Sequence, residues 1–268
     1  FGGQTAINLS QQLDAIGMPI LGSSADAIDI ASDRERFEEF LKSADLPSPP
    51  GSTVETVEQA LGVAKNLGYP VLVRPSYVLG GRAMEIVQNQ TELIRYVSAA
   101  SQLGTNHPIL IDKYLVGREV ELDAICDGEN VLIPGIMEHI ERAGVHSGDS
   151  MGIYPGVTLT EQEVEVLVEY TTKIGLALKV KGLMNIQYVI VGGDPYRSPE
   201  ESKTENTNSS IYVLEVNPRS SRTVPFLSKV TGVPIVNIAT KIMLVNSLIS
   251  YEPSLHYPYR AQETITPL

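Results

Sequence analysis

Four polar side chains alternate with apolar ones along two strand-like segments of the sequence. The two-residue period of a β-strand puts Asn185 and Gln187 on one face of the first segment. The same period puts Glu215 and Asn217 on one face of the second. If the segments pair, amide and carboxylate oxygens meet there, and Mg²⁺ prefers such ligands beside water and phosphate oxygens. The pattern therefore predicts a magnesium site; the alternative is a solvated strand face, although Asn is a poor strand former.

Two arginines, Arg219 and Arg222, follow directly after the second segment. Guanidinium groups form forked hydrogen bonds to phosphate oxygens, and they can offset the charge of a phosphoryl group during its transfer. The pair therefore extends the prediction from metal binding to phosphoryl transfer.

A glycine pair lies between two further arginines, in a run from Arg74 through Gly80 and Gly81 to Arg82. Adjacent glycines let the backbone approach a phosphate and expose its N–H groups, and the arginines supply donors. A surface hairpin with a glycine turn is the alternative. The run is not a P-loop, because G-x-x-x-x-G-K-[ST] is absent.

Two other segments are candidates for nucleotide contacts. The loop 144–147 offers backbone N–H groups and His146, although a loop histidine with ordinary partners is the better interpretation of this segment taken alone. The strand-like run 110–115, followed by Glu119, could hold an adenine and a ribose, with a plain buried strand as the alternative. A hydrolytic metal site that uses His139 and His146 is disfavoured, because H-E-x-x-H is missing.

Helices and strands that must position these residues alternate without a regular βαβ period, which predicts a mixed α+β fold. Strands are predicted at 18–22, 71–74, 84–87, 109–115, 120–126, 131–140, 185–191 and 211–216. Three helices are predicted to begin at the capping pairs Ser32 with Glu35, Thr56 with Gln59 and Thr160 with Glu163. A last helix is predicted from about 234 to 248. The polar stretch 192–210 predicts a surface loop.

Composition excludes several classes of protein. The 268 residues are 43% hydrophobic and 19% charged, as in ordinary globular proteins. A net charge of −12 argues against a nucleic-acid surface, and no apolar run approaches the roughly 18 residues of a membrane span. The single Cys126 lies in an apolar run, so we expect a buried, inert thiol in a reducing compartment, the cytoplasm or, as the alternative, the mitochondrion.

Taken in order, the motifs resemble the ATP-grasp domains of carbamoyl-phosphate synthetase large chains. Five segments that span nearly the whole chain carry the resemblance: Phe1–Thr5, Asp33–Phe37, Arg74–Met84, Glu138–Ser150, and Glu215–Arg222 with Thr223–Phe226. Arg82-Ala83 after the glycines, and Glu138-His139 before the Gly-Val-His-Ser loop, resemble the second half of that chain. In this family the second half phosphorylates carbamate.

The resemblance implies a fold and a set of site residues. It implies an ATP-grasp domain in 28–248, with about 50–112 as a mobile lid, between the end of an α/β pre-ATP-grasp domain (1–27) and the start of a following segment (249–268). The implied nucleotide-binding residues are Arg34, Arg74, Gly80, Gly81, Arg82, Lys113, Leu115, Glu119, Gly144, Val145, His146, Ser147, Gln187 and Glu215. The implied metal ligands are Gln187, Glu215 and Asn217, and the implied catalytic residues are Arg219 and Arg222.

The resemblance also implies an activity, the phosphorylation of carbamate by ATP, within a ligase of arginine and pyrimidine biosynthesis. The implied cofactors are ATP and two metal ions, Mg²⁺ or Mn²⁺. The implied partners are the remainder of the large chain and a glutaminase subunit or domain. Another ATP-grasp ligase such as a biotin carboxylase, and a nucleotide-binding module without catalysis, stay as alternatives. The stretch 192–210 is longer than the family's turn, but it should not shift Gln187 against Glu215 if the hairpin register holds.

Overall fold

The computed structural model describes residues 7–75, 84–102, 108–145, 150–192, 209–245 and 259–261. The chain divides into two compact units. The smaller unit contains Ser48–Val116 and Ala143–Asp149, and the larger unit contains the rest. Both units combine antiparallel sheet with helices, which confirms the predicted α+β class.

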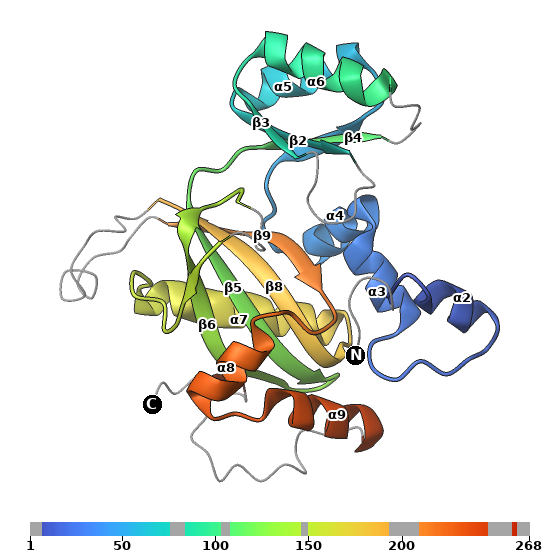
Figure 1. Cartoon of the computed structure of the whole chain (residues 1–268), viewed down its shortest axis with the longest axis vertical. Helices are drawn as coiled ribbons and strands as arrows, with labels where there is room; N and C mark the ends of the chain where they lie inside the picture. Colours follow the sequence, from blue (N-terminus) through green and yellow to red (C-terminus); the bar gives the residue numbers. More distant parts are fainter. Residues whose placement is uncertain are drawn as a thin grey trace. The chain divides into compact units, whose positions relative to one another are not determined.

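In the smaller unit two helices cover one face of a four-stranded antiparallel sheet, in the order β1-β4-β2-β3 (Figure 1). Its elements are β1 (Gly51–Val54), α5 (Val57–Leu67), β2 (Val71–Pro75), β3 (Glu85–Val87), α6 (Gln90–Gln102) and β4 (Ile109–Lys113). Helix α5 begins at the predicted capping box of Thr56 and Gln59, and it ends at Gly68, whose φ of 71° suits glycine. The core lies between the sheet and the helices and includes Ala64, Val73 and Ile111.

The larger unit contains a six-stranded antiparallel sheet in the order β10-β6-β5-β8-β9, with β7 paired to β6. Its strands are β5 (Arg118–Asp127), β6 (Val131–Arg142), β7 (Gly152–Ile153), β8 (Lys181–Val191), β9 (Ser210–Asn217) and β10 (Tyr259–Ala261). Strands β5 and β8 are long and central, and most of their side chains are buried on both faces. The strands predicted at 120–126, 131–140, 185–191 and 211–216 are therefore confirmed, whereas the short β7 and β10 were not predicted.

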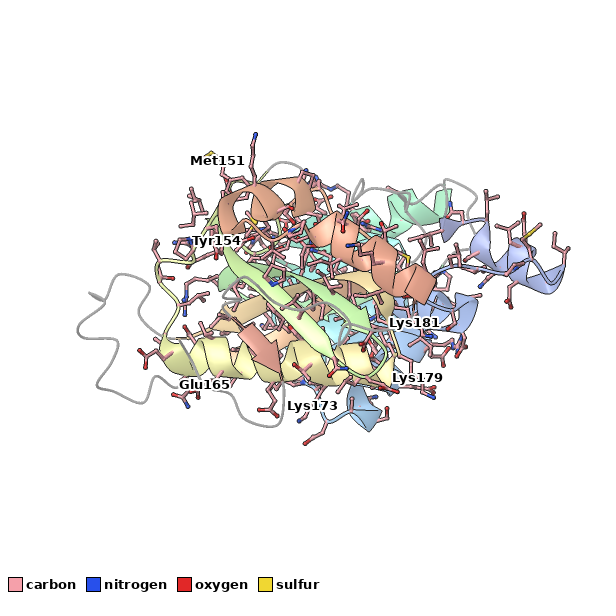
Figure 2. The ribbon with its side chains drawn as sticks, turned by 90° about the horizontal axis from the view of Figure 1, so that it is seen from below. Met151, Tyr154, Glu165, Lys173, Lys179 and Lys181 are labelled. Atoms are coloured by element: carbon pink, nitrogen blue, oxygen red, sulfur yellow. The ribbon has the colours of Figure 1, made fainter. Side chains whose placement is uncertain are left out.

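Helices cover both faces of this sheet. Figure 2 shows α7 (Glu161–Ala177) on one side, with Glu165 and Lys173 on its outer surface, and α8 (Val224–Thr231) and α9 (Ile235–Val245) on the other. The capping box that begins α7 is the predicted pair, Thr160 and Glu163. The core under α7 contains Val120, Leu122, Ala124 and Cys126 of β5, and a second core under α8 and α9 contains Ile125 and Leu183.

Cys126 belongs to the core under α7 and is fully buried, as predicted. Burial raises the pKa of its thiol far above the ordinary value. Helix α7 approaches this sulfur at Gly175, where an added Cβ would lie 2.9 Å from Cys126 Sγ. The thiol is therefore a packing group.

Among the described residues, three short helices precede the smaller unit: α2 (Ser10–Ala15), α3 (Ala25–Ser32) and α4 (Arg34–Ser43). The strand predicted at 18–22 is wrong: this segment is a linker that follows Gly17, whose φ is 73°. The predicted helix start at Ser32 is also wrong, because Ser32 ends α3, and its hydroxyl donates to the Ile28 carbonyl. Asp33 instead caps α4, by accepting a hydrogen bond from the Arg36 amide.

Among the described residues, no single helix is both long and apolar enough to cross a membrane. Only α8 and α9 taken together reach the required length and composition, and they are bent by 110° at their junction.

Candidate functional site

Two rows of cross-strand partners lie on the face of the larger sheet that is opposite α7. The first row is Glu121, Gln187 and Glu215, and the second is Asp123, Asn185 and Asn217. We call these six residues the polar ladder. Cross-strand partners project to the same face with Cβ atoms roughly 4.5–5.5 Å apart. The predicted pairing of the two segments is therefore confirmed, and the register brings Gln187 directly opposite Glu215 despite the long connection 192–210.

A bulge in β9 helps to direct its side chains to the two faces of the sheet next to the ladder. The register shifts after Gln187, so that Leu214 has no partner on β8. Val213 and Val216, on either side of the bulge, both join the core under α7. Glu215 is exposed on the other face. Bulges re-aim side chains in this way and are common beside functional sites.

Half of the ladder is buried. Asp123 is 1% exposed and Asn185 2%, and Asn185 Nδ2 donates to Glu121 Oε1 at 2.8 Å and to Asp123 Oδ1 at 3.2 Å. Burial raises the pKa of Asp123 to about 6, against hydrogen bonds from Thr223 and Ser221 that lower it. Burial also opposes ionisation of Glu121, but hydrogen bonds from His139 and Asn185 outweigh it and lower the pKa of this carboxyl.

His139 is the basic partner of the buried carboxylates. Its Nε2 lies 3.1 Å from Glu121 Oε2, and its Nδ1 lies 3.7 Å from Glu119 Oε1. Burial lowers the pKa of His139, but its hydrogen bond to Glu121 and the charge of Glu119 raise it above the ordinary value. This role was missed from the sequence, which suggested His139 only as part of a disfavoured hydrolytic site. In the described part of the chain, no group of three or more His, Cys, Asp or Glu side chains is arranged to hold a metal ion.

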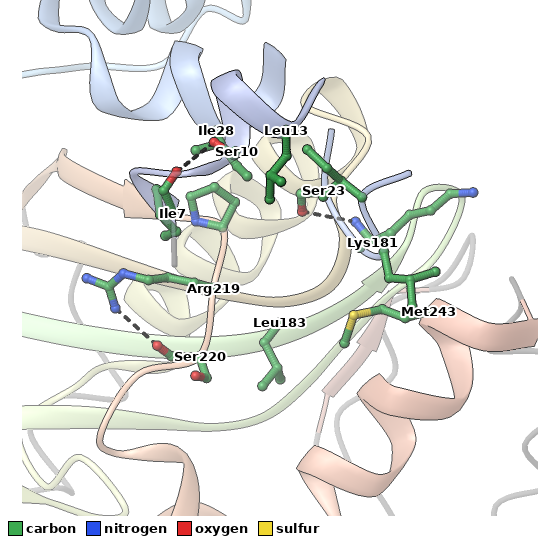
Figure 3. Close-up of a pocket in the computed structure, with 14 residues that line it drawn as sticks. Ile7, Ser10, Leu13, Ser23, Ile28, Lys181, Leu183, Arg219, Ser220 and Met243 are labelled. Carbon is green, nitrogen blue, oxygen red and sulfur yellow. Dashed lines mark hydrogen bonds between the residues drawn. The ribbon is translucent and has the colours of Figure 1, made fainter. Parts of the chain in front are cut away.

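The two predicted catalytic arginines lie at the end of the ladder, in the segment between β9 and α8. Arg219 Nη2 donates to Asn217 Oδ1 at 3.0 Å, and Asn217 Nδ2 donates to Glu215 Oε1 at 3.0 Å. Arg219 Nη1 also donates to the Ser220 carbonyl, and both residues line a cavity of about 160 Å³ (Figure 3). The Nε of Arg219 is buried and has no hydrogen-bond partner among the described residues. Arg222 is exposed.

Two more predicted nucleotide-binding residues belong to the larger unit. Glu119 is 3% exposed and faces His139. Arg34 lies in the first turn of α4, where it pairs with Glu38 at 2.6 Å. In the larger unit, Glu119 therefore contacts the ladder through His139, and Arg219 contacts it through Asn217.

The remaining described candidates belong to the smaller unit. Arg74 Nη2 lies 3.5 Å from Asp112 Oδ2, and Lys113 Nζ donates to the Gly68 carbonyl at 2.9 Å. Leu115 follows the end of β4, and Val145 is 39% exposed. Gly144 has a φ of 99°, which favours glycine.

Tyr114 packs against this glycine: an added Cβ on Gly144 would lie 3.1 Å from the Tyr114 ring. The Tyr114 hydroxyl also donates to the Ala143 carbonyl at 2.9 Å. No motif in the sequence predicts this contact. The candidates Gly80, Gly81, Arg82, His146 and Ser147 lie outside the described residues.

Comparison with known proteins identifies the family. A family model described as "Carbamoyl-phosphate synthase L chain, ATP binding domain" matches residues 33–250. The carbamoyl phosphate synthase large chain of Thermomicrobium roseum is 57% identical over 248 residues, which are 92% of this chain and 22% of that protein. The chain thus spans about a fifth of this curated relative.

Solved structures show the same fold at low identity. The biotin carboxylase domain of Hydrogenobacter thermophilus 2-oxoglutarate carboxylase, in complex with MgADP, ADP and bicarbonate, has a TM-score of 0.74 at 24% identity, over 97% of this chain and 56% of that one. D-alanyl-alanine synthetase A of Vibrio cholerae has a TM-score of 0.71 at 16% identity, over 92% of this chain and 74% of that one. The ATP-grasp fold is confirmed, and this chain belongs to the family of carbamoyl-phosphate synthase large-chain ATP-binding domains.

Proposed function

We propose that this chain transfers the γ-phosphoryl group of ATP to carbamate, which gives carbamoyl phosphate and ADP, as one step of a carbamoyl-phosphate synthase. The observation that carries the proposal is the direct cross-strand pairing of Gln187 with Glu215, shortly before Arg219. The 57% identity to a carbamoyl phosphate synthase large chain supports this enzyme, and the resemblance of Arg82-Ala83 and Glu138-His139 to its second half supports carbamate as the acceptor.

Gln187, Glu215 and Asn217 would hold the Mg²⁺ of Mg-ATP. Their chemistry fits, because Glu215 is exposed and Gln187 is directly opposite it, so that carboxylate and amide oxygens share one surface. When bound, Mg²⁺ neutralises charge on the β- and γ-phosphate oxygens. The MgADP in the Hydrogenobacter structure supports this assignment. A second ion, and Mn²⁺ as a substitute, belong to the same proposal.

The arginines act on the group in transfer. Arg219 and Arg222 bind the phosphoryl oxygens and offset their charge, and Asn217 orients Arg219 through the hydrogen bond to Nη2. A carbamate oxygen attacks the γ-phosphorus in line, the bond to the bridging oxygen of ADP breaks, and the electron pair leaves on ADP. No side-chain nucleophile is needed. The remainder of the large chain and a glutaminase subunit or domain would supply carbamate.

The reverse reaction gives the sharpest test. The 268-residue chain is mixed with Mg-ADP and carbamoyl phosphate, and ATP is measured with a coupled luminescent assay. We expect ATP to form, and to form only when both substrates are present. Two results would contradict the proposal. A chain that binds Mg-ADP but makes no ATP is a nucleotide-binding module, and ADP release from ATP that depends on bicarbonate and biotin indicates a biotin carboxylase.

A further inference from the structure

Two hydroxyl side chains on either side of Arg222 reach back to the same carboxylate of β5. Ser221 Oγ donates to Asp123 Oδ2 at 2.9 Å, and Thr223 Oγ1 donates to the same oxygen. Thr223 Oγ1 also lies 3.3 Å from Glu121 Oε1. The central strand of the sheet is thereby connected to a segment far later in the chain, at the residues next to Arg222.

The hydroxyl of Thr223 makes these bonds in place of its usual one. Thr223 is the N-cap of α8, where a threonine hydroxyl ordinarily accepts a hydrogen bond from an amide of the first turn. No such bond exists in α8. Instead Ser221 Oγ accepts from the Thr223 amide at 3.1 Å and lies 2.6 Å from Thr223 Oγ1. The segment around Arg222 is therefore fixed by contacts to β5, and its threonine contributes no side-chain cap to the helix.

The burial of the Asp123 carboxylate is energetically unfavourable. Asp123 is 1% exposed, and its next neighbour on the same face of β5 is Ile125, in the core under α8 and α9. A buried carboxylate is tolerated only when it is hydrogen-bonded, and three side chains supply those bonds here: Asn185, Ser221 and Thr223. Two of these three donors flank Arg222, so the hydrogen bonds that make the burial of Asp123 possible also hold the segment around this arginine.

We propose that Asp123 is a positioning residue that acts through Ser221 and Thr223. By holding the backbone on both sides of Arg222, it keeps that guanidinium placed for the γ-phosphoryl group of ATP. The inference rests on the proposed function for its phosphoryl partner, but it does not depend on which acceptor receives the group.

The test is the ratio of ATP affinity to ADP affinity, measured by calorimetry with Mg²⁺ on the 268-residue chain. Thr223→Val removes the hydroxyl and keeps the shape of the side chain. We expect it to weaken ATP binding by about tenfold relative to ADP binding, which is the scale of one lost hydrogen bond to a charged group. Thr223→Ser keeps the hydroxyl and should restore the ratio. Thr240→Val is the matched control, because that hydroxyl donates to the Val236 carbonyl within α9.

A double-mutant cycle separates positioning from stability. In an Arg222→Ala background, Thr223→Val should no longer change the ratio, because the arginine that it positions is absent. A full effect in that background, or an equal loss of ATP and ADP affinity, would overturn the proposal. If Thr223→Val unfolds the chain, Ser221→Ala removes the other hydroxyl and is judged by the same ratio. A chain that shows the expected ratios but makes no ATP from carbamoyl phosphate contradicts the proposed function and leaves this inference intact.

Discussion

Strand β5 has two buried faces with opposite chemistry. Toward α7 it presents Val120, Leu122 and Ala124, all fully buried in an apolar core. On its other face it presents Glu119, Glu121 and Asp123, and none of these is more than 4% exposed. One strand therefore supports two environments that differ only in the side chains that alternate along it.

The two faces are held together by different forces. The α7 face gains stability from the removal of apolar surface from water. The opposite face must satisfy each carboxylate with a partner, and it does so with His139, Asn185, Ser221 and Thr223. A carboxylate array of this kind contributes little net stability compared with apolar packing. We therefore expect the apolar packing of β5 toward α7 to stabilise the fold more than the carboxylates on its opposite face do. We call the first the stability face and the second, where the proposed site lies, the chemical face.

The largest effect should follow from Glu215→Ala on the chemical face. We expect ATP formation from carbamoyl phosphate to fall on the order of a thousandfold, the upper range for loss of one electrostatic contact to the transition state. Because Glu215 is exposed, the free energy of unfolding should change by less than about 0.5 kcal/mol. Glu165→Ala, on the outer surface of α7, is the matched control and should alter neither quantity. Normal turnover by the Glu215 variant would refute the metal role.

The reverse behaviour is expected on the α7 face. Leu122→Ala removes a fully buried side chain, and the free energy of unfolding in urea should fall by about 2–5 kcal/mol. ATP formation per folded molecule should stay within about twofold of the starting chain, because no contact of the ladder is removed. If turnover instead fell as far as in the Glu215 variant, at a temperature where the chain is folded, the two faces would not be separable.

Four of the six ladder residues could be predicted from the sequence. Asn185, Gln187, Glu215 and Asn217 were found because they lie at a two-residue polar period in strand-like segments, and two arginines follow the second segment. Glu121 and Asp123 were missed, although acidic residues at every second position from Glu119 were a visible signal. Their partners lie in other strands and in the segment before α8, and no local pattern states which strands will be neighbours.

The errors in the fold have local causes. Met18–Gly22 has the composition of a strand, but a strand also needs a second strand to pair with. The sequence of this segment does not say whether such a partner strand lies beside it. Ser32 and Asp33 are adjacent capping residues, and the choice between them depends on where α3 ends. Capping pairs succeeded at Thr56 and Thr160, where no helix precedes them directly.

A smaller effect, in pH dependence, should follow from Asp123→Asn. The native pKa of about 6 is above the ordinary 3.8, so the folded chain binds more protons at this site than the unfolded chain between these values. This contribution to stability is present below about pH 4 and is lost as the pH rises through 6, by on the order of 2–3 kcal/mol. Asn cannot titrate, so the difference in unfolding free energy between variant and starting chain should change across that window.

Glu121 and His139 titrate in both chains, so they enter this difference only through their coupling to the Asp123 charge. Urea unfolding at about pH 4, 5, 6 and 7 measures it. A constant difference across the series would show that Asp123 is charged throughout. At about pH 7 the variant should be the more stable chain, as expected when a desolvated charge is removed from the interior.

The smallest effect concerns a polar contact on the stability face. Thr171 Oγ1 and Tyr188 Oη lie 2.8 Å apart between α7 and β8, and both residues are fully buried. Tyr188→Phe leaves the threonine hydroxyl without this partner and should cost about 1–2 kcal/mol, and Thr171→Val should cost a similar amount. The double variant should be less destabilised than the sum of the two, because it removes both polar groups together.

Thermal and urea unfolding of the four chains in this cycle measure the coupling, and ATP formation should be unchanged in all of them. A double variant that is as destabilised as the two single changes added together would mean that the hydrogen bond carries no coupling. The expected result separates this pair from the cluster of Asp123, Ser221 and Thr223, where Asp123→Asn should stabilise the chain at about pH 7 and Thr223→Val should weaken ATP binding relative to ADP binding. We then expect Thr171 and Tyr188 to be exchangeable for apolar residues without loss of ATP formation, whereas Glu215 of the ladder should not be.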